Sequence, residues 1–198
     1  MCSSDLRKMT TRPVELNEYK EIIALLNGGF NYEVEGKEKT FRPNYQISLA
    51  LQLQASLGLR IGDVLALRLK NFRNGKLEIT EDKTDKLQYR DIDAGITQAI
   101  YQYAVENNIK NDDKLFNIGV RAIQKQLKIV TDYLGLENIS THSFRKLYAV
   151  TAYEDNNNNI ELVKELLNHT SIATTQRYIR VSQQAINKAS KNINFMMI

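Results

Sequence analysis

The chain has few of the residues on which metal and redox sites depend: one cysteine, two histidines and no tryptophan among 198 residues. One cysteine can form neither an intramolecular disulfide nor a cysteine-based zinc site, and two histidines cannot build a histidine-rich metal centre. No stretch approaches the roughly 18 apolar residues that a membrane helix needs. The first residues also lack the apolar core of a signal peptide. We therefore expect a cytoplasmic protein that uses no cofactor and no metal.

The remaining composition is that of an ordinary globular protein. It is 42% hydrophobic and 25% charged, with 9 Gly and 2 Pro, and 198 residues suffice for one large domain with its own core. Lys and Arg number 27 against 23 Asp and Glu, for a net charge of +4. This mildly basic balance permits a nucleic-acid partner but does not demand one.

The hydrophobic pattern predicts a mainly α domain with one small antiparallel β-sheet, an α+β arrangement. Apolar residues alternate with polar ones in 77–80 and 87–92 around the polar turn 81–86, which predicts a β-hairpin. Gly28-Gly29 and residues 35–39 (Glu-Gly-Lys-Glu-Lys) are expected to form a loop after the first helix. Helices are expected at 16–27, 44–57, 61–69, 97–106, 120–134, 144–153, 160–167 and 174–181.

Both histidines lie near predicted helix starts and close to groups that can bind phosphate. His142 and Arg145, three residues apart, share one face of a helix start. His169 comes just before another helix start, and Tyr178 follows nine residues later. Helix N-termini suit phosphate because their N–H groups and dipole attract anions. Each residue alone can equally be a structural one that is satisfied by hydrogen bonds, so the combination carries the argument.

Two further clusters add cations to this set. Arg60 lies in a Gly-Leu-Arg motif at a predicted helix start, and Lys83 and Lys86 lie at the tip of the predicted hairpin. Arg60 can alternatively pair with Asp63 at i, i+3, and Lys83 can be a solvated surface charge.

With these residues in place, the chain resembles the catalytic domain of the tyrosine recombinase (phage integrase) family, over about residues 11–186. A lone His-x-x-Arg is a weak signal, but five matches in the family's order are specific. The family's motifs fall on Arg60 with Asp63 at its acidic position, Lys83, His142 with Arg145, His169, and Tyr178 nine residues later. The resemblance implies that family's catalytic-domain fold and a site-specific DNA recombinase or integrase, of a mobile element.

The resemblance also implies a role for each residue. Arg60 and Arg145 can each bind the non-bridging oxygens of a DNA phosphate bidentately and stabilise its transition state. Tyr178 attacks the phosphate, which leaves a 3′-phosphotyrosine and expels a 5′-hydroxyl. Lys83 is expected to protonate the leaving oxygen as general acid, with Lys86 as the competing residue.

The histidines and the remaining cations complete the expected site. His142 and His169 hydrogen-bond the phosphate or assist proton transfer near the nucleophile. The partner is double-stranded DNA, on which the protein forms a homotetramer, whereas in solution it is a monomer. Candidate contacts to the DNA backbone are Lys86, Arg177 and Arg180.

The chain departs from the family pattern at two positions and at both ends. Gly62 stands where many members have Ser, and Asn168 where Gly is common. The helical DNA-clamping domain that usually comes first is missing, which fits either a naturally short member, such as the fimbrial invertases, or a truncated chain. Residues 1–10 are expected to be disordered or artefactual, because Cys2–Leu6 is what one reading frame of a common sequencing adapter encodes.

The C-terminal tail is expected to be an interaction element. Residues 187–198 follow the recombinase domain and end in four apolar residues, Phe195–Ile198. An exposed apolar tail usually docks on another surface, and in the family this segment links subunits. We expect it to pack on its own domain in a monomer or on a neighbouring subunit in the assembly.

Two other functions remain open at this point. A type IB topoisomerase or a telomere resolvase shares the phosphotyrosine chemistry, although the compact spacing from His142 to Tyr178 favours a recombinase. A DNA-binding regulator can keep the fold without catalysis, although the complete set of candidate residues argues against it.

Overall fold

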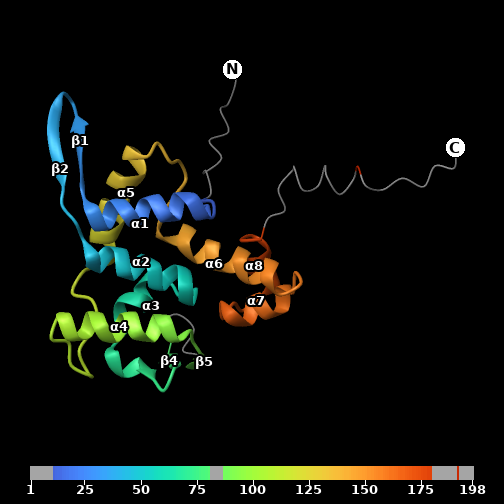
Figure 1. The fold of residues 1–198 in the computed structure, drawn as a ribbon. Helices are drawn as coiled ribbons and strands as arrows, with labels where there is room; N and C mark the ends of the chain where they lie inside the picture. The colour runs from blue at the N-terminus through green and yellow to red at the C-terminus, as the bar shows by residue number, and fades with distance from the viewer. Residues whose placement is uncertain (1–10, 81–86, 180–190, 192–198) are drawn as a thin grey trace, which may run out of the picture.

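The computed structural model describes residues 11–80, 87–179 and 191. In these residues, helices dominate and strands form two small sheets (Figure 1). The helices are α1 (Leu16–Gly28), α2 (Tyr45–Leu57), α3 (Ile61–Ala66), the 3₁₀ turn η1 (Leu69–Asn71), α4 (Ala94–Glu106), α5 (Val120–Tyr133), α6 (Thr141–Asp155), α7 (Ile160–Leu166) and α8 (Ile172–Gln176). The strands are β1 (Phe30–Val34), β2 (Lys37–Phe41), β3 (Phe72–Arg73), β4 (Lys76–Thr80) and β5 (Leu87–Asp91).

The centre of the fold is α2, which packs against α1, α3 and α6. Its buried side chains lie on several sides of the helix, including Ile47, Ala50, Leu53 and Leu57. A helix that is apolar around most of its circumference is stable only when neighbours cover it. Figure 1 shows α2 between α1 on one side and α3 and α4 on the other. The position of α2 matters for function because its C-terminal end leads directly into Arg60.

The predicted β-hairpin is confirmed, as β4 and β5. Its tip, residues 81–86, lies outside the described residues. The structure adds the short strand β3, which pairs antiparallel with β4 and makes a three-stranded sheet. The sequence did not predict β3 because two residues are too short to show an alternating pattern.

The prediction of a loop at residues 35–39, and of only one sheet, is wrong, because β2 begins at Lys37. Here β1 and β2 form a second antiparallel hairpin, which projects from the helical body (Figure 1). Its turn uses Glu35 and Gly36 at positive φ. Its side chains are mostly exposed, so the strands lack a clean alternating pattern. The stack of Phe30 on Phe41, with ring centroids 5.0 Å apart, and the contact of Phe30 with Tyr133 hold it in place.

The predicted helices are confirmed, with shifted ends. The helix expected at 61–69 ends at Ala66 and is followed by η1, and the helix expected at 174–181 is the shorter α8. The other helix ends move by a few residues, which is the usual uncertainty of capping. The N-terminal extension 1–10 and, apart from residue 191, the tail 187–198 lie outside the described residues. No helix in the described part of the chain is long and apolar enough to span a membrane.

The last three helices form a small apolar cluster of their own, at the opposite end of the molecule from the β1–β2 hairpin (Figure 1). Ala149 of α6 and Val163 and Leu167 of the α7 region are fully buried there. Tyr178 and Ile179 pack against this cluster from the end of α8. The packing brings the end of the described chain against the first turns of α6.

Candidate active site

The nucleophile predicted from the sequence meets the first histidine directly. Nε2 of His142 lies 2.5 Å from the hydroxyl of Tyr178, and the two rings are perpendicular with centroids 5.5 Å apart. His142 is placed by the start of α6, where Ser140 is the N-cap and its hydroxyl accepts a hydrogen bond from the His142 N–H. When Nε2 carries no proton, the phenol donates, which is the geometry for proton transfer from Tyr178 to His142.

The second histidine is placed by a Schellman motif at the end of α7. Asn168 has a φ of +52°, and the N–H groups of Asn168 and His169 donate to the carbonyls of Glu165 and Lys164. This pattern of two reversed bonds closes helices at a left-handed residue. Gly is the usual residue there and Asn the next, which explains why the departure from Gly at this position is tolerated.

His169 is buried beside the nucleophile. Only 5% of the residue is exposed, its Nδ1 lies 2.9 Å from the Thr175 hydroxyl, and its ring is perpendicular to that of Tyr178 at 5.1 Å. Burial, assisted by the charges of Arg145 and Arg60 and by the neighbouring His142, lowers the pKa of His169 to about 4. His169 is therefore neutral near pH 7 and can exchange hydrogen bonds without adding charge to the site.

Arg145 is the most deeply buried of the predicted catalytic residues. None of its surface is exposed. Its Nη1 donates to the Gly58 carbonyl at 2.6 Å, and its Nη2 donates to the Leu167 carbonyl at 2.7 Å. A guanidinium can make both bonds at once because its donors are fixed in a plane. Arg145 thus joins the loop before Arg60 to the loop before His169.

Arg60 lies at the N-cap of α3 and faces the same region. The alternative pairing with Asp63 is present, at 3.9 Å between Nη1 and Oδ2. Asp63 is buried, whereas 23% of the Arg60 side chain is exposed. At this distance the pair is loose, and the charge of Arg60 also reaches His169. A partly exposed guanidinium at the edge of the site is suited to binding an incoming phosphate.

The structure also places a cation that the sequence analysis did not single out. Nζ of Lys146 lies 5.5 Å from the centroid of the Tyr178 ring and donates to the carbonyl and the hydroxyl of Thr11. Lys146 is four residues after His142, so both lie on one face of α6. That spacing was the signal in the sequence that could have identified it.

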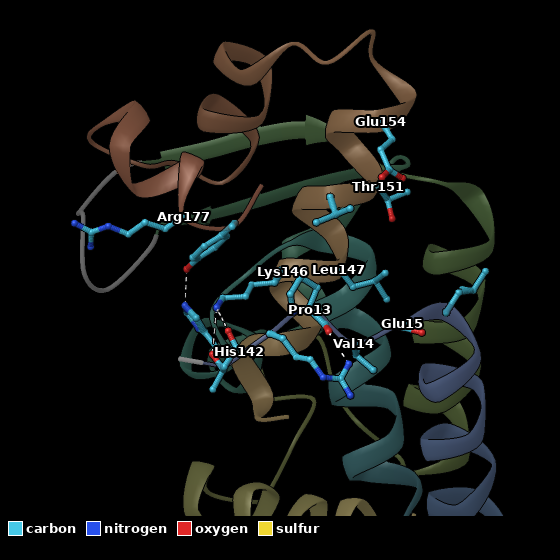
Figure 2. Close-up of a pocket in the computed structure, with 14 residues that line it drawn as sticks. Pro13, Val14, Glu15, His142, Lys146, Leu147, Thr151, Glu154 and Arg177 are labelled. Carbon is cyan, nitrogen blue, oxygen red and sulfur yellow. Dashed lines mark hydrogen bonds between the residues drawn. The ribbon is translucent and has the colours of Figure 1, made fainter. Parts of the chain in front are cut away.

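A cavity of about 940 Å³ opens beside the nucleophile, between residues 11–16 and α6 (Figure 2). His142 and Lys146 line it at the end near Tyr178, and Leu147 and Val150 line its apolar wall. Arg177 also belongs to the lining of this cavity (Figure 2). Arg177 is exposed, in keeping with its predicted contact to a DNA backbone.

Three predicted site residues remain outside the description. Lys83, Lys86 and Arg180 fall in the segments that the structure does not describe, so their roles stay predictions. Six candidates are described. Besides Arg177, they are Arg60, His142, Arg145, His169 and Tyr178, which come together from α3, α6, the end of α7 and the end of α8. Within residues 11–80, 87–179 and 191, no three His, Cys, Asp or Glu side chains gather as potential metal ligands.

The sequence analysis missed the partners that hold these residues. Thr175, which contacts His169 from six residues away, was not singled out. The carbonyls of Gly58 and Leu167 bind Arg145 from 87 and 22 residues away. They are found only when the chain is folded, because a backbone carbonyl carries no side-chain signal.

Comparison with known proteins decides the family. The model of the phage integrase family matches residues 17–185. The chain belongs to the phage integrase family. This confirms the predicted resemblance, which was assigned to residues 11–186, and with it the fold of a tyrosine recombinase catalytic domain.

Similar proteins show how much of the sequence is shared. A protein from Bacillus subtilis (strain 168) described as a probable integrase/recombinase is 33% identical over 143 residues, which are 67% of this chain and 76% of that protein. A probable integrase/recombinase of Acholeplasma phage L2 is 26% identical over 155 residues, 73% of this chain and 52% of that one. The chain spans about half the length of several such relatives.

Solved structures of phage integrase family proteins confirm the architecture. The catalytic domain of bacteriophage HP1 integrase has a TM-score of 0.61 and 19% identity, over 92% of this chain and 95% of that one. XerA recombinase has a TM-score of 0.68 and 16% identity, over 95% of this chain and 66% of that one. At such identities the likeness shows the shared fold.

Proposed function

We propose that this chain is the catalytic part of a site-specific recombinase that cleaves and rejoins DNA through a 3′-phosphotyrosine at Tyr178. The observation that carries the proposal is the 2.5 Å contact between the Tyr178 hydroxyl and Nε2 of His142, with Arg60, Arg145 and His169 around it. A nucleophile, a proton acceptor and two guanidiniums are the groups that phosphoryl transfer to a phenol requires.

The reaction can be written with each proton assigned. The Tyr178 oxygen attacks the phosphorus, its proton passes to Nε2 of His142, and the bond from phosphorus to the 5′ oxygen breaks. Charge on the pentacoordinate phosphorus is balanced by Arg60 and Arg145. The 5′ oxygen takes a proton from a general acid, for which Lys83 remains our proposal. A second DNA end reverses the steps, so strands are rejoined without an external energy source.

The nucleophile is proposed to act in cis. Tyr178 contacts His142 of its own chain, and its backbone N–H donates to the carbonyl of Thr175, which also binds His169. The short link from His169 to Tyr178 supports a tyrosine that acts in its own site.

The partner in this proposal is double-stranded DNA. Two of the similar solved structures are a XerH recombinase bound to difH substrate and a lambda integrase dimer bound to a core site. The same partner is proposed here because Arg60 and the exposed Arg177 offer cations near the nucleophile. Backbone contacts by Lys86 and Arg180, a tetramer on DNA, docking by residues 187–198 and a cytoplasmic mobile-element setting are proposed with it.

Covalent trapping tests the function. Nicked duplexes tiled from the DNA that flanks the gene are incubated with wild-type protein or Tyr178→Phe, in EDTA. The expected result is a protease-sensitive protein–DNA adduct with wild type alone. DNA binding without an adduct on any duplex contradicts the proposal and favours a non-catalytic regulator. Relaxation of a supercoiled plasmid that lacks any of these sequences favours a topoisomerase instead.

A further inference from the structure

Arg90, on β5, makes contacts that no motif in the sequence suggested. Its Nη2 donates to the carbonyl of Leu57, and its Nη1 donates to the carbonyl of Leu166 at 3.1 Å. These acceptors are 33 and 76 residues away in the sequence. Leu57 is the last residue of α2, and Leu166 is the last residue of α7. Arg90 therefore joins the C-terminal ends of two helices.

Arg145 joins the same two helix ends one residue further on. It donates to the carbonyls of Gly58 and Leu167, which directly follow Leu57 and Leu166. Two guanidiniums thus bind consecutive carbonyls on the same pair of chain segments. We call these four carbonyls and the two guanidiniums that bind them the arginine clamp.

Elementary electrostatics explains why the clamp needs arginine. The last carbonyls of a helix have no partner within the helix and carry the negative end of its dipole. Two such ends brought together repel each other unless a cation lies between them. A guanidinium supplies the charge and two donors in fixed directions, whereas an ammonium is a single point donor.

A tyrosine supports Arg90 in this position. The Arg90 guanidinium lies 5.8 Å from the centroid of the Tyr148 ring, and Nη1 lies 3.4 Å from its hydroxyl. The same ring packs closely on Gly58, where a Cβ would come within 2.4 Å of it. Gly58 also has a φ of +64°. Tyr148 of α6 thus packs against both Arg90 and Gly58 of the clamp.

The clamp lies immediately before two of the residues proposed to act on the phosphate. Arg60 follows Leu57 by three residues, and His169 follows Leu166 by three residues. The distance between the two helix ends thus sets where Arg60 and His169 meet the substrate. A small misplacement of such groups costs a large factor in rate.

We propose that Arg90 is a positioning residue for DNA cleavage. It holds the ends of α2 and α7 together, so that Arg60 and His169 can contact the same phosphate. Arg90 itself touches no substrate. The inference rests on the proposed function, and it separates Arg90 from Arg145, which belongs both to the clamp and to the phosphate site.

The first test measures cleavage at saturating protein in a single turnover. Arg90→Met removes the Arg90 half of the clamp and leaves the Arg145 half in place. Arg90→Lys keeps the charge without the two directed donors. Arg73→Met is the matched control because Arg73 is an exposed arginine in the same sheet. Each variant is given a nicked duplex with either a normal phosphate or a methylphosphonate at the cleaved position. The methylphosphonate lacks one anionic oxygen, so less negative charge in its transition state has to be stabilised by Arg60.

We expect Arg90→Met to slow adduct formation at least tenfold on the normal phosphate while DNA affinity changes less than threefold. The defect shrinks several-fold on the methylphosphonate, Arg90→Lys is intermediate, and Arg73→Met matches wild type. An equal defect on both substrates, or a loss confined to DNA affinity, would overturn the proposal.

The second test does not depend on cleavage. The chain has only two histidines, so the imidazole of His169 can be followed by NMR as the pH is changed. The charged and titratable groups that act on it are Arg145, Arg60 and His142. Loosening the clamp lets water reach His169, so Arg90→Met should raise its pKa from about 4 toward its ordinary 6.5.

The two tests separate a failure of the positioning role of Arg90 from a failure of the proposed function. An unchanged His169 titration in folded Arg90→Met overturns the positioning role, whatever the cleavage result. A raised His169 pKa together with a wild-type protein that forms no adduct supports the clamp and contradicts the proposed function. If Arg90→Met does not fold, Arg90→Lys is expected to show the same changes in weaker form.

Discussion

The hydroxyl of Tyr178 lies 2.5 Å from Nε2 of His142 in the same chain. The proposed nucleophile and its proposed proton acceptor thus belong to the same protomer. Their meeting depends on α6 and α8 packing on α7, since 36 residues separate the two side chains in the sequence.

Assembly in cis predicts that two inactive variants cannot help each other. Tyr178→Phe keeps Arg60 but lacks the nucleophile, and Arg60→Ala keeps the nucleophile but lacks the guanidinium. Because each site uses its own tyrosine, a mixture of the two should form no more adduct than Arg60→Ala alone. The measurement is covalent trapping of the mixture, and restored adduct would show cleavage in trans.

Arg145 is predicted to matter for stability as well as for cleavage. Arg145→Met leaves the buried carbonyls of Gly58 and Leu167 without their charged donor, and should lower the free energy of unfolding by about 3 kcal/mol or more. Arg145→Lys should lose less, because it keeps the charge. Denaturant unfolding measures both, and a wild-type midpoint for Arg145→Met would contradict the structural role.

The buried His169 predicts sensitivity to acid. Its folded-state pKa of about 4 is below the ordinary 6.5, so between these values the unfolded chain binds more protons than the folded one. Stability is therefore fully present above pH 6.5 and falls as the pH is lowered toward 4, by up to about 3 kcal/mol.

The control for this effect is His169→Asn. The variant is expected to be less stable at pH 7, where it loses the contact with Thr175, but to show a flatter dependence of stability on pH. Unfolding is measured for both proteins at several values between pH 7 and pH 4. Equal slopes for the two proteins in this window would refute the assignment.

The left-handed backbone at Asn168 predicts an order among its variants. With a φ of +52°, Asn168→Ala should be less stable than Asn168→Gly by about 1 kcal/mol, because a Cβ is disfavoured in this conformation. Both variants lose the Asn side chain, so their difference isolates the backbone effect. Thermal unfolding measures it, and an alanine variant as stable as the glycine one would be unexpected.

Lys146 is predicted to hold the nucleophile in place. Lys146→Met loses the donor to Thr11 and the cation beside the Tyr178 ring, and should slow adduct formation by about threefold to tenfold. Lys146→Arg should recover most of the rate, because it restores both contacts. Single-turnover trapping with DNA affinity measured alongside checks this, and no recovery with Arg would count against a role for the cation.

The sequence predicted the helices and the β4–β5 hairpin well, because both depend on local periodicity and on caps such as Ser140 and Gly58. It failed on β1 and β2, whose strands are charged and exposed and are held by Phe30 against Phe41. When a few aromatic contacts stabilise a pair of strands, the sequence of those strands shows no alternation of apolar and polar residues.

The proposed chemistry follows from the sequence alone, because five motifs in a fixed order supply the residues that a phosphotyrosine reaction needs. Only the tertiary structure decided how those residues are held. Arg90 and Arg145 bind carbonyls that lie 22 to 87 residues away. The partner atoms belong to the backbone, which is the same at every residue, so no side-chain motif can mark them before the chain folds.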